Sequence, residues 1–243
     1  IDVINFKTTK DLFDKFWERK QRLLDKRSSR WVEVVFFLSN YMSERQTLIA
    51  PASIMDKFGI LPEAMASEHI LIKEGDRYAF FHQEFFHYTF ARNFCAQNRE
   101  LVPFMKKDVQ HLFRRTQVMQ ILSREREENF VHYIADLESM LNDHEIRFHL
   151  KQIVFALLAD LGDPNIDEWR VVAQFLDNSA DSRSKEVKYI LYKSTPWINL
   201  LKSEGQLSKW LASAREENIN LAIILLSKVQ KDHAFAQLES WMR

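Results

Sequence analysis

A histidine between a predicted strand and a predicted helix is the side chain with the clearest capacity for chemistry in this sequence. His82 follows the aromatic run 78–81 and precedes an apolar segment over residues 83–97. At such a junction the strand and the helix can aim the imidazole at a neighbouring group, and imidazole exchanges protons near neutral pH. The same position suits a helix cap or a satisfied core histidine. The residues alone therefore leave the role of His82 open.

Other reactive residue types do not form a recognisable catalytic or metal-binding pattern. The sequence contains no GxxxxGK[ST], HExxH, CxxC or GxSxG motif. His82 and His87 are five residues apart, as are His144 and His149, which places neither pair on one helical face for a metal. Cys95 lies in the apolar segment, where a buried, inert thiol is expected. The sequence thus predicts no catalytic residue and no metal ligand, and we do not expect this chain by itself to be an enzyme.

Composition and charge indicate a mainly helical globular protein. Of 243 residues 46% are hydrophobic, and only four are Gly and five Pro, too few for the turns of an all-β fold. Lys plus Arg equals Asp plus Glu at 34 each, so no net field favours nucleic acid or an anionic membrane. One cysteine, no signal peptide and no long apolar run predict a cytoplasmic protein without a membrane segment. The start at Ile1, without methionine, suggests part of a longer polypeptide.

The patterns between residues 8 and 98 predict the element order of a winged helix, which is three helices followed by a β-hairpin. The expected helices cover 31–42, 53–58 and a segment opening at Pro62, and the expected strands cover 70–72 and 78–81. A loop is expected around Pro51. In the helix after the hairpin, Phe86, Phe90 and Phe94 recur every four residues, which predicts a buried aromatic face.

An amphipathic helix over residues 8–27, with Thr8 or Thr9 as its N-cap, precedes these elements. Its end is basic, through Lys20, Arg22, Lys26, Arg27 and Arg30. These side chains could contact phosphates, but the helix dipole also favours basic residues near a C-terminus. We interpret them as a solvated helix end.

After Pro103 the sequence predicts only helices. Their expected ranges are 112–126, 130–141, 146–161, 169–176, 186–192, 197–202, 207–215, 220–229 and 234–242. Short amphipathic helices that cannot bury their apolar faces alone favour a stacked α-solenoid of HEAT type, with an irregular helical array as the alternative. The predicted domains are a helical linker (1–30), a winged helix (31–98) and a helical-repeat domain (99–243).

A winged helix raises the question of DNA binding, since its last short helix usually enters the major groove. That segment here, PEAMASEHI, contains two glutamates and no Lys or Arg, and neither occurs between Phe58 and Ile72. Counterion release cannot supply affinity from such a surface, which argues against nucleic acid as a partner.

The segment FFHQEFFHYTFARNF resembles the end of the winged helix in STAND-class NTPases, the NACHT and AP-ATPase type. These proteins commonly show the pattern Phe-x-His-x-x-Phe-x-x-Tyr/Phe-x-x-Ala, and the matching residues are Phe80, His82, Phe85, Tyr88 and Ala91. Phe-Ala-Arg at residues 90–92 is most similar to the bacterial antiviral Avs type. The resemblance covers residues 8–98, including the helix that links the ATPase core to the winged helix.

The resemblance implies a signalling switch whose ATPase core, with Walker A and Walker B motifs, lies upstream in the same polypeptide. His82 would contact a phosphate of ADP or ATP that this core holds with Mg²⁺. The helical repeats would sense a protein ligand, such as a phage protein, and couple it to homo-oligomerisation in antiphage defence. The alternatives are a HEAT-like interaction scaffold without a nucleotide role and a winged-helix DNA-binding module.

Overall fold

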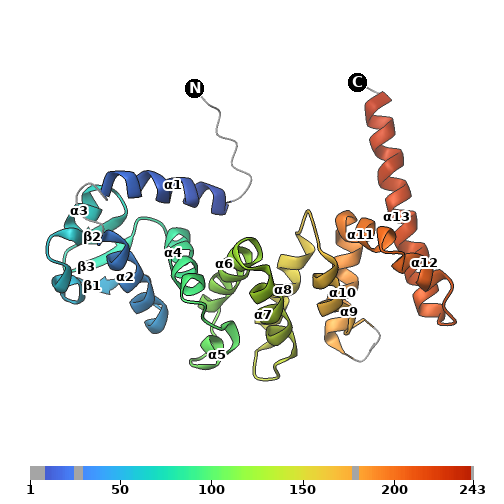
Figure 1. The fold of residues 1–243 in the computed structure, drawn as a ribbon, viewed down its shortest axis with the longest axis horizontal. Coiled ribbons are helices and arrows are strands. Elements are labelled where there is room, and N and C mark those ends of the chain that lie inside the picture. Colours follow the sequence, from blue (N-terminus) through green and yellow to red (C-terminus); the bar gives the residue numbers. More distant parts are fainter. Residues whose placement is uncertain (1–8, 25–29, 177–180, 242–243) are drawn as a thin grey trace. The chain divides into compact units, whose positions relative to one another are not determined.

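The computed structural model describes residues 9–24, 30–176 and 181–241, and it is helical apart from one small sheet (Figure 1). This confirms the predicted mainly α fold with a small β-hairpin and a helical array. The chain divides into two compact units, the first ending at Phe130 and the second beginning at Val131. The proposed N-cap Thr8 and the basic residues Lys26 and Arg27 lie outside the described residues.

The first unit has the element order and sheet of a winged helix. Its elements are α1 (Thr9–Leu24), α2 (Trp31–Arg45), β1 (Ala50–Pro51), η1 (Ala52–Phe58), α3 (Leu61–Ser67), β2 (Leu71–Glu74), β3 (Arg77–Phe80), α4 (Gln83–Ala96), α5 (Leu101–Lys106) and α6 (Phe113–Glu128). The sheet order is β1-β3-β2 and both pairs are antiparallel, with Ala50 opposite Tyr78 and Leu71 opposite Phe80. Gly75 takes a positive φ of 60° in the hairpin turn, a conformation that glycine adopts without strain.

Helix α4 is the centre of the first unit, because it is buried on nearly all sides. The predicted aromatic face of Phe86, Phe90 and Phe94 is buried, and so are Phe85 and Tyr88 on another face. Helices α1, α2 and α6 and strand β3 all pack against α4. A helix with large aromatic side chains on more than one face is stable in water only when other elements enclose it.

Two elements of this region were not predicted from the sequence, and the first compact unit extends past residue 98. The expected loop around Pro51 contains the short strand β1, which was missed because two residues carry no alternating pattern. Helix α5 was also missed, and its Pro103 is tolerated because it lies in the first helical turn. Because α6 packs on α4, the first compact unit continues to Phe130, beyond the domain boundary expected at residue 98.

The second unit is a series of helices. They are α7 (Phe130–Asn142), α8 (Phe148–Ala159), α9 (Ile166–Ala173), α10 (Ser182–Lys193), α11 (Thr195–Ser203), α12 (Gln206–Leu211) and α13 (Glu216–Trp241). The prediction of two helices over 220–229 and 234–242 was wrong, because α13 is continuous between them.

Helices α8 and α10 are parallel neighbours in this unit. Gln152 donates to Glu186 at 3.4 Å near their starts, and Lys193 pairs with Asp160 at 2.5 Å near their ends. At their first turns, Lys151 and Arg183 both donate to the backbone carbonyl oxygen of Leu141, at 3.0 and 2.9 Å. Parallel stacking of every second helix is the arrangement expected of repeated helix pairs.

A buried arginine ties α6 to α2 in the first unit. Arg114 is 1% exposed and donates to the Ser43 hydroxyl oxygen at 2.8 Å and to an Asp108 carboxylate oxygen at 3.1 Å. Gln117 also donates to Ser43, at 2.9 Å. The Arg114 guanidinium lies 4.5 Å from the centroid of the Phe104 ring. Because every partner is polar or aromatic, this charge is buried with its hydrogen bonds made.

We expect Arg114→Leu to lower the free energy of unfolding by about 2–4 kcal/mol, because it leaves the polar partners of the guanidinium without their donor. The neighbouring Arg115 is exposed, so Arg115→Leu is the matched control and should change stability by less than about 0.5 kcal/mol. Urea denaturation followed by circular dichroism measures both. Equal stability of the two variants would show that the network contributes nothing.

Candidate functional site

His82 is the N-cap residue of α4 and is positioned by backbone hydrogen bonds on both sides. Before it, the Phe81 amide donates to the Ile70 carbonyl oxygen at 3.1 Å, which fixes the end of the hairpin. At the cap, the backbone of His82 is extended, with φ −146° and ψ 138°, and its Nδ1 accepts from the Glu84 amide at 3.1 Å. The helix-cap interpretation of His82 is therefore confirmed, and the core interpretation is wrong because the side chain is exposed.

The cap also determines which ring nitrogen of His82 can meet a ligand. An Nδ1 that accepts a hydrogen bond carries no proton, so the neutral ring holds its proton on Nε2. Among the described residues, no hydrogen bond or ion pair joins Nε2 to the protein. The ring contacts Phe13 of α1 and Phe81, at centroid distances of 6.4 and 6.3 Å. The result is an oriented N–H donor on an exposed side chain.

The other four residues of the STAND-like pattern are buried. Phe80, Phe85, Tyr88 and Ala91 all lie in the core around α4, and the rings of Phe85 and Tyr88 stack at 5.6 Å. Their residue types are thus explained by packing. His82 is the member of the pattern whose side chain faces solvent.

A polar cluster behind this site fastens α1 to α4 and α6. The Tyr88 hydroxyl donates to an Asp14 carboxylate oxygen at 2.6 Å, and Lys10 pairs with the other carboxylate oxygen at 2.8 Å. Arg92 and Arg124 lie 3.6 and 3.9 Å from Asp14. Burial opposes ionisation of Asp14, but hydrogen bonds from Lys10 and Tyr88 and the nearby positive charges outweigh it and lower the pKa of the carboxyl. Burial, with the bond to Asp14, raises the pKa of Tyr88 to about 12.

Sequence reasoning did not find this cluster. Lys10 and Asp14 are four residues apart, as are Tyr88 and Arg92, and such spacing indicates that each pair shares a helical face. No sequence pattern relates Asp14 to Tyr88, because the two lie 74 residues apart.

The basic end of α1 has a structural role at one position. Lys20 donates to the backbone carbonyl oxygen of Glu68 and lies 3.5 Å from its carboxylate, so it joins α1 to the end of α3. Arg22 and Arg30 are exposed and pair with Glu18 and Glu33. In the candidate recognition helix α3, Glu63 pairs with Lys73 of β2 at 2.8 Å. This leaves the α3 surface without an excess of positive charge, in keeping with the argument against DNA binding.

His87 is buried one turn into α4. Its ring packs between Phe86 and Phe113, at centroid distances of 4.6 and 5.6 Å, and its Nε2 lies 3.5 Å from the Gln83 side-chain nitrogen. Burial lowers the pKa of His87 from 6.5 to about 4. His87 is therefore a neutral core residue, and the structure does not bring it together with the exposed ring of His82. Cys95 is half-buried, with its sulfur 3.9 Å from the Ile121 carbonyl oxygen.

Comparison with known proteins identifies no relative. No protein-family model, no curated protein and no solved structure matches the chain. Within the described residues, no helix combines the length and the apolar character needed to cross a membrane.

We expect His82→Ala to lower the free energy of unfolding by about 1 kcal/mol, because it removes the side-chain acceptor at the start of α4. His82→Asn should restore most of this loss, since asparagine is among the best N-cap residues. Thermal and urea unfolding of the three proteins measure the effect. Three indistinguishable unfolding curves would contradict the cap.

The stability of the first unit should depend on pH through His87. Because burial lowers the folded-state pKa of His87, the unfolded state binds a proton first as pH falls, and stability is lost from about pH 6.5 down to about pH 4. The loss should reach about 3 kcal/mol. His87→Phe keeps the aromatic packing without a titrating group, so its stability should fall less over this range. NMR titration of the His87 ring checks the cause, and a ring that titrates near pH 6.5 would contradict it.

Proposed function

We propose that the chain is the regulatory winged-helix and helical-repeat portion of a STAND-class NTPase, most similar to the antiviral Avs type. His82 donates a hydrogen bond from Nε2 to a phosphate of ADP or ATP. A P-loop domain upstream in the same polypeptide holds the nucleotide and its Mg²⁺. In this proposal the chain supplies one accessory contact and no catalytic residue.

The orientation of His82 is the observation that carries the proposal. Within the STAND-like pattern the apolar residues and Tyr88 form the core, whereas the imidazole lies at the surface with Nδ1 committed to α4. The proton on Nε2 then suits a phosphate oxygen, which accepts hydrogen bonds strongly. The position at the N-terminus of a helix of 14 residues also favours an anion, because the helix dipole is positive there.

The residues of this chain could make one contact to a nucleotide phosphate, but they do not form a complete nucleotide-binding site. His82 offers a single donor, and the sequence has no Gly-rich loop to surround phosphates with backbone amides. When bound, the nucleotide would supply the negative charge of its phosphates, and this charge would differ between ADP and ATP. The chain's own part is to present the imidazole from a rigid helix start, which the cap and the ring contacts with Phe13 and Phe81 hold in place.

The mechanism we propose is a two-state hinge in the cytoplasm. In the resting state the winged helix closes over ADP through His82. A protein ligand, such as a phage protein, binds the helical repeats and favours the open state, in which nucleotide exchange and homo-oligomerisation follow. The parallel stack of α8 and α10 supports a repeat surface for such a ligand. The same stack supports the second candidate, a HEAT-like scaffold without a nucleotide role.

The test uses the full polypeptide that joins this chain to its P-loop domain. His82→Asp keeps a strong N-cap acceptor but replaces the donor with a negative charge, so ADP should dissociate at least about tenfold faster and basal activity should rise. His82→Ala should show the same direction. A stopped-flow displacement of fluorescent ADP measures the rate, and His87→Phe, altered one turn further along α4, is the control with unchanged release.

Unchanged ADP release in both His82 variants would leave His82 with the cap role alone. An open reading frame without a P-loop upstream of Ile1 would contradict the proposal as a whole and favour the scaffold.

A further inference from the structure

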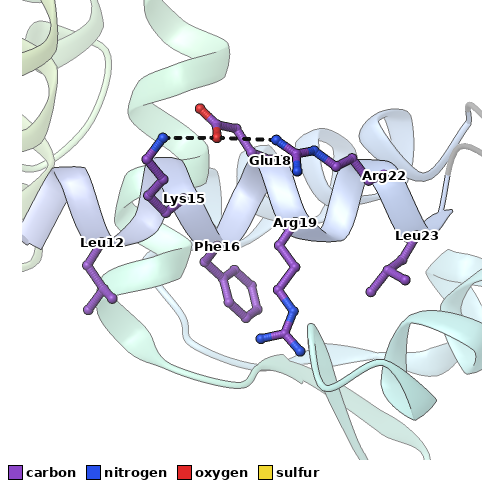
Figure 2. Close-up of a pocket in the computed structure, with 7 residues that line it drawn as sticks. All are labelled: Leu12, Lys15, Phe16, Glu18, Arg19, Arg22 and Leu23. Atoms are coloured by element: carbon purple, nitrogen blue, oxygen red, sulfur yellow. Dashed lines mark hydrogen bonds and ion pairs between the residues drawn. The ribbon is translucent and has the colours of Figure 1, made fainter. Parts of the chain in front are cut away.

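A groove runs along α1 between residues 12 and 23. It has a volume of about 740 Å³ and we call it the α1 groove. Figure 2 shows that its lining side chains project from α1 in two rows. One row contains Leu12, Phe16, Arg19 and Leu23, and the other contains Lys15, Glu18 and Arg22. The first row recurs at the three- and four-residue spacing that places side chains on one helical face.

The apolar side chains of the first row are partly exposed to solvent, and packing of the core does not account for this exposure. Leu12 and Leu23 are 44% and 41% exposed, although α1 buries Phe13, Trp17 and Leu24 on its other face. A helix normally needs one apolar face to pack on its domain. Helix α1 has that face and a second apolar strip beside it, and exposed apolar strips with polar rims are typical of interaction sites.

The α1 groove is held on a rigid support. Phe16 packs against Phe81 and Phe85, at centroid distances of 4.9 and 5.0 Å, so the floor of the groove continues into the core. Asp14 of α1 also accepts the hydrogen bond from Tyr88 of α4, at 2.6 Å. A surface that is already ordered binds with a smaller entropic cost than one that must fold on binding.

The charged side chains of the groove favour a partner with negative charge. Glu18 lies 3.2 Å from Lys15 and 4.0 Å from Arg22, so one carboxylate is shared between two cations. Arg19 stands within the apolar row and has no ion pair among the described residues. Three positive charges against one negative charge leave the groove with an excess of two positive charges. Buried in an interface, that excess needs carboxylates from the partner.

We infer that the α1 groove binds an amphipathic helix of a protein partner, with apolar residues along its centre and acidic residues along its flank. The distance from Leu12 to Leu23 along α1 is about 16 Å, which matches three turns of a docked helix. A membrane surface is the alternative occupant, and binding to lipid vesicles distinguishes it in the test. This inference does not depend on the nucleotide contact of His82.

The test uses a synthetic amphipathic helical peptide of about four turns, with leucines on one face and glutamates on the flanks. Fluorescence anisotropy should detect binding to the full chain, and the affinity should fall as salt increases. Arg19→Glu should weaken binding about five- to tenfold by reversing the charge inside the groove. Leu23→Ser should weaken it as well. Lys185→Glu makes the same charge change at an exposed residue of α10 and is the matched control, with binding unchanged.

Three results would overturn the inference. They are no binding of the acidic peptide, equal binding of a peptide with lysines in place of the glutamates, and equal binding by the Arg19→Glu and wild-type proteins. Preferential binding to phosphatidylcholine vesicles containing about one-third phosphatidylserine would instead assign the groove to a membrane surface.

Discussion

Enclosure of α4 is the constraint on which the first unit depends. Its side chains from Phe85 to Ala91 are all buried, so α4 is unstable unless α1, α2, α6 and β3 cover it. The covering elements supply aromatic partners from distant parts of the sequence, including Phe13 and Trp17 of α1. Among the aromatic side chains of α4, Tyr88 also makes a polar contact, the hydrogen bond that its hydroxyl donates to Asp14. His82 is exposed because the N-terminus of α4 is where this enclosure ends.

Helix α1 consequently has two surfaces with different roles. One surface closes the core through Trp17, whose ring lies 4.7 Å from that of Trp31 and 4.6 Å beneath the guanidinium of Arg92. The other surface is the α1 groove, where Phe16 also contacts the core and Leu12 and Leu23 are exposed. Because α1 contacts His82 through Phe13, the helix that presents the groove also supports the imidazole. A partner in the groove and a phosphate at His82 would thus both act on the contact between α1 and α4.

The sequence predicted most helices and the position of His82, and it failed where a feature depends on contacts between distant residues. The four-residue repeat of Phe86, Phe90 and Phe94 was sufficient to identify α4, since local periodicity determines a helical face. Strand β1 exists only because Ala50 meets Tyr78 in the sheet, and a two-residue strand carries no pattern of its own. The cap at His82 was one of two alternatives, because choosing between a buried and an exposed ring requires knowing which elements cover it. The boundaries of α13 were missed because a charged, weakly patterned stretch interrupts its apolar residues.

The proposed contact of His82 with a phosphate is tested most directly by NMR of its two imidazole nitrogens in the full polypeptide. A long-range ¹H–¹⁵N NMR spectrum distinguishes Nδ1 from Nε2 and reports the hydrogen bonding of each nitrogen. We predict that the Nε2 resonance shifts when ADP is bound, whereas the Nδ1 resonance retains the signature of an acceptor because it caps α4. A ring protonated on Nδ1, or an Nε2 resonance that is identical with and without ADP, would contradict it.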